Sequence, residues 1–464
     1  MGLSPPIAAL ATPPGKSGVA VVRTSGRGIL HQVLPLLRSP GGRPVGGEDF
    51  PPRQLQRMDL VEGVGGPVLD QALVVFFPGP ASFTGEDQVE FHCHGSPVVV
   101  TRLLELLTLQ GIAPAGPGEF SRRAFLNGKM DLVRAEAVME LIQAASLRGA
   151  RVAARHMGGG LSRSFGEIKQ ALVLLLAHLE AHLDFPDEEL DPRDESALLQ
   201  GVLDLTARLT DLGGNARLGQ LLHDGFELAI VGRPNVGKSS LFNLLVQEDA
   251  AIVTPHPGTT RDLNLRTLQI DGIPVRLVDT AGLRRAAGVV EQEGIRRARG
   301  KLGEADGILV VLEAHRGVLA EDLEILAALG KVDFLLVWNK GDLRDAAFPL
   351  PDLPPLVQSP MATLVTSCAT GGGLPQLVQA IARLLGSRDG GGEGDAILVA
   401  RQRAVLERAQ SALMECGGLL QQGRPLELVA LPLREAVTAL GELTGEVTHA
   451  DLLDTIFSTF CIGK

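Results

Sequence analysis

The sequence predicts a multidomain protein of the α/β and α+β classes, with a P-loop domain inserted into a discontinuous helical domain. Three observations lead to this fold class. The chain has 464 residues, about three times a typical domain of ~150 residues. Short β-like segments fill its first part, and a helical periodicity of three and four follows and then returns near the C-terminus. Between the two helical parts, apolar strands alternate with helices, as in a parallel α/β sheet.

The N-terminal segment reads as a compact α+β domain. Residues 19–23 and 72–77 are rich in valine, alanine and phenylalanine and are expected to be strands. Loops rich in glycine and proline, such as residues 39–47, separate these short strands.

The helical parts lie on both sides of the α/β segment. Leu172, Leu175, Leu176 and Leu179 share one face of an expected helix. A glycine-rich linker, residues 386–394, precedes the second helical part. Two independent helical domains would look similar, but one interrupted domain is the simpler interpretation. The expected domains are residues 1–128, residues 129–225 (helical, first part), residues 226–386 (a Ras-like G domain) and residues 387–464 (linker and helical, second part).

Composition limits the classes of function. A formal net charge of −11 argues against general electrostatic coating of nucleic acid, so an RNA contact would need a local basic patch or a partner. Cys93, Cys368, Cys416 and Cys461 are far apart and indicate reduced thiols. No secretory signal is recognisable at the N-terminus, and the longest strongly apolar run, residues 171–177, is too short to span a bilayer. We expect a cytoplasmic protein with no membrane contact.

A phosphate-binding loop follows the strand expected at residues 227–231. Gly232-Arg-Pro-Asn-Val-Gly-Lys-Ser239 satisfies the pattern G-x-x-x-x-G-K-[ST], and a helical segment comes next. Lys238 is expected to reach the β- and γ-phosphates, and the Ser239 hydroxyl to ligate Mg²⁺. The expected nucleotide contacts of this loop are Asn235, Val236, Gly237, Lys238, Ser239 and Ser240.

Three later segments identify the base and complete the site. Asp279-Thr280-Ala281-Gly282 follows an apolar strand and offers an acid near the metal and a backbone N–H for the γ-phosphate. Asn339-Lys340-Gly-Asp342 ends another strand, and the Asp342 carboxylate can accept hydrogen bonds from guanine N1–H and its amine. Ser367, Cys368 and Ala369 could hold the base through their backbone. The sequence therefore predicts a hydrolase whose substrate is GTP.

The hydrolytic machinery departs from that of many small GTPases. Thr260 is expected to complete the Mg²⁺ shell. Leu283 stands where a glutamine often orients the attacking water, and leucine cannot do so. Glu291 is the best candidate for orienting water, although a solvated glutamate at the start of a helix is the alternative. Another cation must offset charge in the transition state.

Four segments, together with the nucleotide site, resemble the MnmE (TrmE) family of tRNA-modification GTPases. They are Ala11-Thr-Pro-Pro-Gly-Lys-Ser-Gly-Val-Ala-Val-Val-Arg23, Ser82-Phe-Thr-Gly-Glu-Asp-Gln-Val-Glu90, Pro117-Gly-Glu-Phe-Ser-Arg-Arg-Ala-Phe-Leu-Asn-Gly-Lys129 and Phe460-Cys-Ile-Gly-Lys464. The resemblance covers essentially the whole chain. It implies a G domain that interrupts a helical domain, and an N-terminal domain that dimerises and binds a one-carbon folate such as 5-formyl-tetrahydrofolate.

The resemblance also assigns site residues. Arg23, Glu90, Lys129 and Lys464 match the folate-contacting positions, whereas the residues alone would make Arg23 and Lys129 surface charges. K⁺ is the implied charge-compensating cation, with Asn235, Thr254, His256 and Thr259 around it; Thr254 and Thr259 also belong to the GTP site. His256 follows Pro255 and stands where an aliphatic residue is commoner. Glu291, Lys238 and Asn235 are the implied catalytic residues.

The implied function is modification of the wobble uridine of certain tRNAs. A homodimer forms a heterotetramer with a flavoprotein of the MnmG (GidA) type and adds an aminomethyl-type group, for example carboxymethylaminomethyl. Two alternatives are a GTP-switched ribosome-assembly factor and a folate-binding scaffold with vestigial hydrolysis. The acidic chain argues against the first, and the intact nucleotide motifs argue against the second.

Cys461 and the pair His92 and His94 could suggest redox or metal chemistry, but simpler interpretations are favoured. Cys461 is expected to be a packing thiol that seats the C-terminus, with a redox role as the alternative. His92 and His94 would face one side of a strand, but two ligands without a third do not make a zinc site.

Overall fold

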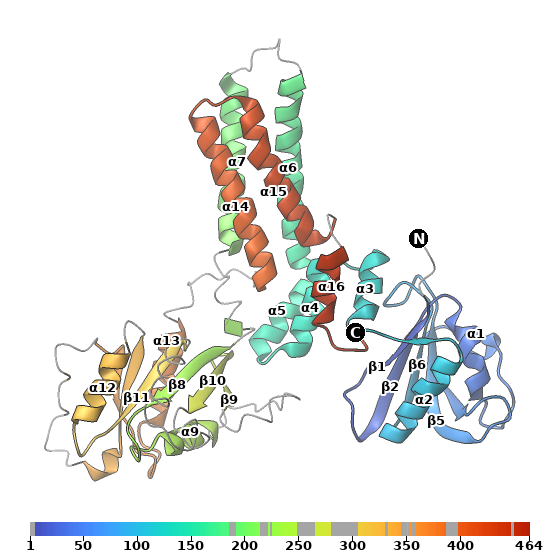
Figure 1. The fold of residues 1–464 in the computed structure, drawn as a ribbon, viewed down its shortest axis with the longest axis horizontal. Coiled ribbons are helices and arrows are strands. Elements are labelled where there is room, and N and C mark those ends of the chain that lie inside the picture. The colour runs from blue at the N-terminus through green and yellow to red at the C-terminus, as the bar shows by residue number, and fades with distance from the viewer. Residues whose placement is uncertain are drawn as a thin grey trace. The chain divides into compact units, whose positions relative to one another are not determined.

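In the computed structural model, the chain forms two compact units. Figure 1 shows the helices and strands of the chain. The first unit contains Met1–Met139, His156–Glu167 and Leu440–Lys464, and the second contains Glu140–Arg155 and Ile168–Ala439. The structure describes residues 5–184, 192–213, 221–222, 225–247, 265–279, 305–329, 333–344, 350, 353, 359–386, 398–446 and 450–464. None of the helices in these ranges combines the length and the apolar character that crossing a membrane requires.

The first unit is built on a seven-stranded sheet, with the order β3-β4-β5-β6-β2-β1-β7. Its strands are β1 (Ile7–Leu10), β2 (Ser17–Ser25), β3 (Leu37–Arg38), β4 (Gln56–Val61), β5 (Val68–Phe77), β6 (Gln88–Gly95) and β7 (Ala113–Pro114). Neighbours pair antiparallel except β1 and β7, which are parallel. The strands predicted at residues 19–23 and 72–77 are confirmed as parts of β2 and β5.

The two faces of this sheet differ because side chains alternate along each strand. Val22 and Phe91 belong to the core that also contains residues of α1 (Ile29–Val33) and α2 (Pro97–Leu109). Arg23 and Glu90, each one position away, are therefore on the opposite face. Two short 3-10 helices, Leu34–Leu36 and Gly47–Asp49, lie between the strands in the sequence.

The C-terminal end of the chain packs against the N-terminal domain within this unit. Helix α16 (Ala450–Ser458) contacts α3 (Glu119–Leu126). Beyond α16, Ile462 forms an antiparallel bridge with Pro117, and the Phe120 N–H donates to the Lys464 carbonyl at 3.1 Å. Residues far apart in the sequence thus meet beside the sheet.

The helical segments that precede and follow the second sheet contact each other. Gln410 Nε2 donates to Thr210 Oγ1 at 2.7 Å, and Arg434 pairs with Glu180 at 3.0 Å. Of the predicted leucine face, Leu172 and Leu179 are fully buried. The helices are α4 (Leu132–Gln143), α5 (Leu147–Met157), α6 (Gly160–Asp184), α7 (Pro192–Gly213), α14 (Ala400–Gln421) and α15 (Leu426–Thr444).

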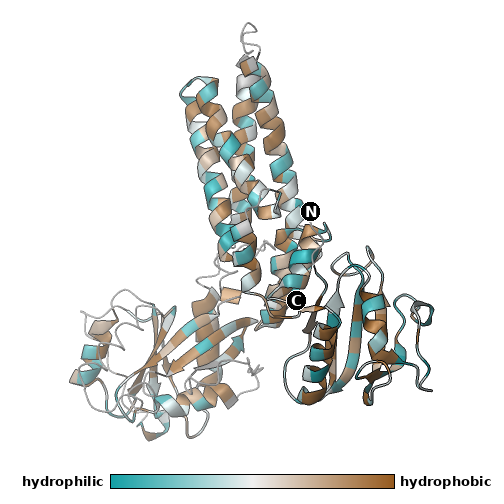
Figure 2. Cartoon of the chain, turned by 45° about the vertical axis from the view of Figure 1, so that its right-hand side comes forward, coloured by the Kyte–Doolittle hydropathy of each residue, from teal (hydrophilic) through white to brown (hydrophobic). Residues whose placement is uncertain are grey.

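The second unit contains a six-stranded sheet, with the order β13-β12-β11-β8-β10-β9. Its strands are β8 (Phe226–Val231), β9 (Leu265–Ile270), β10 (Ile273–Asp279), β11 (Gly307–Glu313), β12 (Phe334–Asn339) and β13 (Ala362–Val365), and its helices are α9 (Lys238–Gln247), α12 (Ala320–Ala328), α13 (Leu374–Gly386) and the 3-10 helix η3 (Gly341–Leu343). Every residue of β11 and β12 is buried, and both strands are hydrophobic (Figure 2). This pattern is typical of the centre of a parallel sheet.

The second sheet departs from the expected parallel arrangement in one strand. β9 pairs antiparallel with β10, whereas the other neighbours pair parallel. The connection between β9 and β10 is the two-residue turn Asp271-Gly272, which is too short for a crossover and requires a hairpin.

Close packing around Gly118 predicts a specific loss of stability. An added Cβ at Gly118 would lie 2.7 Å from the Phe457 carbonyl oxygen and 2.9 Å from the Phe460 Cβ. Gly128 is a matched control, since its φ of 68° is close to the 61° of Gly118 but no atom lies within 4 Å of an added Cβ. We expect Gly118→Ala to lower the free energy of unfolding by about 1–3 kcal/mol more than Gly128→Ala does, measured in urea. Equal losses would contradict this packing of the C-terminal segment.

Candidate functional site

The nucleotide-binding motif lies at the carboxyl edge of the second sheet. β8 ends at Val231, and α9 begins at Lys238. The loop between them comes close to Asn339-Lys340-Gly341-Asp342, the segment expected to bind guanine and called the base-recognition segment below. An added Cβ at Gly237 would lie 2.1 Å from Asn339 Nδ2. Only glycine fits there, and the helix start presents backbone N–H groups suited to phosphate oxygens.

Lys238 is held inside this loop. Its ammonium donates to the carbonyls of Gly232 at 2.8 Å and Arg233 at 2.6 Å, and the residue is 7% exposed. Ser239 and Ser240, which follow it, are exposed. Phosphate oxygens would replace the carbonyls as acceptors of the ammonium, as the sequence prediction requires.

Asn339 connects the two predicted halves of the nucleotide site. Its Nδ2 donates to the Val236 carbonyl of the P-loop at 2.9 Å. Its Oδ1 accepts from Thr366 Oγ1 and Cys368 Sγ, each at 3.3 Å. Asn339 is 1% exposed, so these bonds are made where water does not compete.

The residues predicted to read guanine lie together at the ends of β12 and β13. Ser367 Oγ donates to Asp342 Oδ1 at 2.5 Å, and the Gly341 N–H donates to the Thr366 carbonyl at 2.9 Å. Burial raises the pKa of the Cys368 thiol, the hydrogen bond to Asn339 lowers it and the Asp342 charge raises it; the net shift is upward. A protonated thiol is the form that donates to Asn339.

Thr366 is a site residue that the sequence analysis missed. It is 2% exposed, and its hydroxyl reaches Asn339. Nothing in the sequence distinguishes it from an ordinary residue at the end of a strand, since its role depends on two strands being adjacent in the sheet.

Arg233 is, besides Lys238, the other cationic side chain inside the P-loop motif. Its Nε donates to Asp322 Oδ1 of α12 at 2.7 Å, and its side chain is 8% exposed. The guanidinium is therefore engaged by a buried carboxylate instead of standing exposed at the loop surface.

Several predicted residues of the nucleotide site lie outside the described residues. Asp279 is described in its backbone, which ends β10 opposite Ile230 of β8 and thus at the same sheet edge as the P-loop. The residues outside are Thr254, His256, Thr259, Thr260, Thr280, Ala281, Gly282, Leu283 and Glu291.

A second candidate site lies on the sheet face of the first unit that carries Arg23. Arg23 Nε donates to Glu90 Oε1 at 2.8 Å across the strand pair, and His92 Nε2 lies 3.4 Å from Glu90 Oε2. The guanidinium carbon lies 5.8 Å from the centre of the Phe83 ring and 5.9 Å from that of Phe120. The side chain of Arg23 is only 19% exposed, so its interpretation as a surface charge is wrong.

Lys464 lies near this pair, whereas Lys129 is engaged elsewhere. Burial lowers the pKa of the Lys464 ammonium, the Arg23 charge lowers it further and the Glu90 charge opposes both; the net shift is downward. Lys129 is exposed, and its ammonium donates to the Pro80 carbonyl at 2.9 Å. The structure thus brings three of the four predicted folate residues together, whereas Lys129 lies on a loop and is bonded to Pro80.

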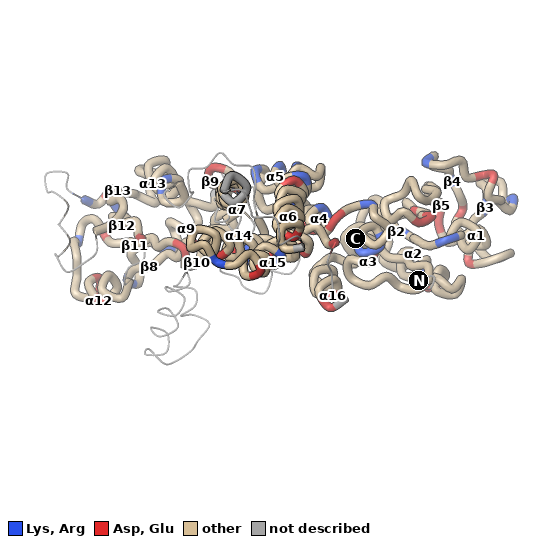
Figure 3. The backbone as a smooth tube through the Cα atoms, turned by 90° about the horizontal axis from the view of Figure 1, so that it is seen from above, with Lys and Arg blue, Asp and Glu red and all other residues tan. Residues whose placement is uncertain are grey.

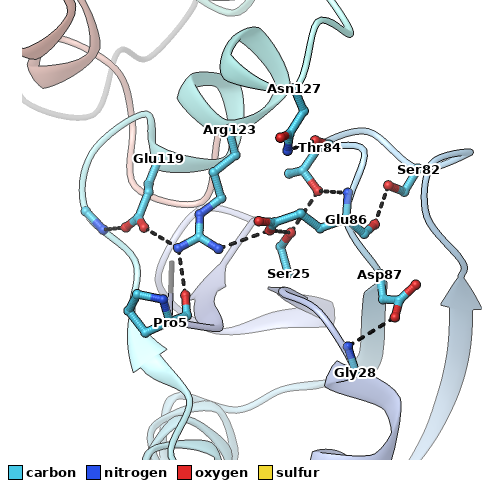
Figure 4. Close-up of polar contacts among 11 residues, drawn as sticks. Pro5, Ser25, Gly28, Ser82, Thr84, Glu86, Asp87, Glu119, Arg123 and Asn127 are labelled. Carbon is cyan, nitrogen blue, oxygen red and sulfur yellow. Dashed lines mark hydrogen bonds and ion pairs between the residues drawn. The ribbon is translucent and has the colours of Figure 1, made fainter. Parts of the chain in front are cut away.

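Arg123 fixes the walls of this second site and was not predicted. Figure 4 shows its guanidinium between Glu86 and Glu119, at 3.0 and 2.7 Å, with the Pro5 carbonyl at 2.8 Å. Glu86 belongs to the loop that carries Phe83, and α3 carries Phe120. The buried arginine therefore holds both aromatic rings in place.

Two further expectations concern thiols and histidines. The Cys461 thiol is exposed, so its interpretation as a packing thiol is wrong; its carbonyl instead accepts from the Gly118 N–H at 3.4 Å. His94 Nδ1 lies 2.7 Å from Asp70 Oδ1. Within the described ranges, no three histidine, cysteine or acidic residues form a group that could hold a metal.

Known proteins resemble the chain along its whole length. The family model of the GTP-binding protein TrmE N-terminus matches residues 6–129, and that of the MnmE helical domain matches residues 132–461. The tRNA modification GTPase MnmE of Magnetococcus marinus is 49% identical over 461 residues, which are 99% of this chain and 97% of that protein. The chain belongs to the MnmE family. The tRNA modification GTPase MnmE of Koribacter versatilis is 40% identical over 465 residues, with 100% of both chains covered.

Membership of the MnmE family confirms the prediction that the protein is a GTPase. These relatives are named GTPases, and the P-loop, Asn339 and Asp342 are the residues of this chain that we expect to bind the guanine nucleotide. The enzyme is a GTP hydrolase, as the sequence motifs predicted.

The bond between Thr366 and Asn339 yields a test of the nucleotide site. Thr366→Val keeps the shape of the side chain but removes the hydroxyl, so that Asn339 Oδ1 loses one donor. We expect GTP binding to weaken about fivefold, which corresponds to about 1 kcal/mol. Thr366→Ser keeps the hydroxyl and should bind GTP nearly as wild type does. A titration in which both variants bind equally well would remove the hydroxyl from the site.

Proposed function

We propose that this MnmE-family enzyme uses GTP hydrolysis to drive modification of the wobble uridine of certain tRNAs. A flavoprotein partner of the MnmG (GidA) type completes a heterotetramer around a homodimer, and an aminomethyl-type group, such as carboxymethylaminomethyl, is added in the cytoplasm. The observation that carries the proposal is the contact of the C-terminal segment with the Arg23 face of the first sheet. One chain thereby combines a guanine-nucleotide site with a second site of different chemistry.

The second site suits a folate that carries a one-carbon unit, such as 5-formyl-tetrahydrofolate. Arg23 and Glu90 together offer the donors and acceptors that a pterin ring requires. Phe83 offers a partly exposed aromatic ring, and Lys464 offers a cation for the glutamate tail. Lys129 would need to leave the Pro80 carbonyl to join them. When bound, the folate supplies the one-carbon unit, while these residues bind and orient it.

The domain organisation that we propose has the boundaries expected from the sequence. Residues 1–128 bind folate and dimerise, residues 226–386 form the G domain, and residues 129–225 and 387–464 form the helical domain and its linker. Contacts between α7 and α14, and between α6 and α15, support a helical domain assembled from both parts.

In the nucleotide site, we propose that Mg²⁺ is held by Ser239 and Thr260. K⁺ would be held by the side-chain oxygen of Asn235 and by backbone carbonyls of the loop that contains Thr254, His256 and Thr259. Asn235 is exposed on the P-loop with a φ of 64°, and its amide oxygen is a ligand type suited to a hard cation. Glu291 would orient the attacking water.

A contact with tRNA requires a local basic surface on this acidic chain. Residues 141–166 contain four arginines and no acidic residue. Arg148, Arg151 and Arg155 of α5 lie at helical spacing and are exposed, and α5 carries basic residues along its length (Figure 3). Such a row is suited to phosphate contacts, which supports α5 as the tRNA-contacting helix.

The proposed cation predicts that hydrolysis depends on K⁺. We expect faster GTP turnover in KCl than in NaCl of equal ionic strength, because the cation offsets charge that develops in the transition state. Loss of one such electrostatic contact costs ~10²–10³-fold in rate. Asn235→Ala should abolish most of the difference between the salts. Equal rates for the wild type in KCl and NaCl would defeat the cation mechanism.

The folate site and the tRNA function are tested together. Arg23→Ala should weaken binding of 5-formyl-tetrahydrofolate in calorimetry and leave GTP affinity within error, because the two sites use different residues. Cells whose only copy is this variant should lose modified wobble uridines, measured by mass spectrometry of tRNA nucleosides.

The matched control is Arg43→Ala, which removes the exposed ion pair with Asp49 in the same domain. It should leave both folate affinity and the nucleoside profile unchanged. A normal nucleoside profile in cells that lack the protein altogether would contradict the proposed tRNA function. It would not affect the assignment of the protein as a GTP hydrolase.

A further inference from the structure

A group of charged residues around the buried Glu313 joins two segments of the nucleotide site, the P-loop and the base-recognition segment, and connects them to α12. Glu313, the last residue of β11, is 5% exposed. Its Oε1 accepts from the Lys340 ammonium, and its Oε2 lies 3.5 Å from Arg316 Nε and 3.7 Å from the Arg233 guanidinium. One carboxylate therefore contacts cations of the P-loop and of the base-recognition segment.

The Arg233 side of this group is anchored to α12. Asp322 is fully buried, and its Oδ1 accepts from Arg233 Nε at 2.7 Å. Its Oδ2 accepts from the Leu319 N–H at 3.0 Å, which caps the helix. Arg233 is thus fixed between a helix start and Glu313, and cannot shift without uncovering buried charge.

The Lys340 side belongs to the segment that reads the base. Lys340 lies between Asn339 and Asp342, and its backbone has the left-handed φ of 59°. Its side chain is 31% exposed. Without the contact to Glu313, this long side chain would therefore rotate freely in water. Burial would raise the pKa of Glu313, but the hydrogen bond and charge of Lys340, with smaller contributions from Arg316 and His315, lower it overall. The carboxylate is therefore charged when it holds Lys340.

We propose that Glu313 is a positioning residue for guanine-nucleotide binding, which fixes Lys340 and ties the base-recognition segment to the P-loop through Arg233. A lysine that is already ordered loses less rotamer entropy when the nucleotide arrives. Glu313 thus raises affinity for the part of the ligand that GTP and GDP share. The inference rests on guanine-nucleotide binding alone and is independent of folate and tRNA.

The test uses Glu313→Gln in the full chain, which preserves the shape and removes the charge. We expect GTP and GDP each to bind about tenfold more weakly, with kcat at saturating GTP within about twofold of wild type. Glu313→Asp, which keeps the charge on a shorter side chain, should recover part of the affinity. The control is Glu321→Gln, an exposed glutamate in the first turn of α12, which should bind both nucleotides as wild type does.

A double-mutant cycle separates positioning from a merely structural role. If Glu313 acts through Lys340, then Glu313→Gln combined with Lys340→Met should bind GTP no more weakly than Lys340→Met alone. Additive losses would overturn the proposal, because they would mean that Glu313 acts independently of Lys340. Unchanged affinity in Glu313→Gln, or a fall in kcat without a fall in affinity, would overturn it as well. If Glu313→Gln does not fold, the same cycle is measured with Glu313→Asp. Non-additive losses of GTP affinity with Lys340→Met would then support the proposal, and additive losses would overturn it.

Discussion

The hydrogen bonds of Asn339 hold together three loops that follow different strands of the second sheet. The side chain donates to the P-loop at Val236 and accepts from Thr366 and Cys368 of the segment after β13. The parallel order of β8, β11, β12 and β13 places these strand ends at one edge. The segments that we expect to bind the phosphates and the base are therefore connected through one buried amide.

In the first unit, separate segments are held together by ion pairs of one arginine instead of by an amide. Arg123 joins Glu86 and Glu119 with a backbone carbonyl, and is almost fully buried. Removing the arginine would take from both carboxylates and from the Pro5 carbonyl the one donor that they share. The same α3 that Arg123 anchors also receives the C-terminal segment, since the Phe120 N–H binds the Lys464 carbonyl. The shape of the candidate folate site and the seating of the chain end thus depend on one arginine.

The sequence predicted the strands and the nucleotide motifs, and the order of these motifs along the chain, because they depend on local patterns and fixed spacings. It missed Thr366, Arg123 and Glu313, whose partners are brought near only by strand order and loop packing. It also missed the antiparallel β9, although the two-residue Asp271-Gly272 turn was a readable signal. The Cys461 thiol was misjudged because exposure depends on how the terminal segment meets Gly118, and no local pattern records that contact.

The position of Arg233 bears on the source of the catalytic cation. To serve the γ-phosphate, Arg233 would have to leave Asp322, which is fully buried, at a cost of about 3–5 kcal/mol. An arginine finger contributes about 10³–10⁵ in kcat, which corresponds to about 4–7 kcal/mol. Most of the gain would be lost in breaking the existing pair. A cation taken from solution and held by Asn235 carries no such penalty, because it leaves the Arg233–Asp322 pair and the Glu313 carboxylate in place.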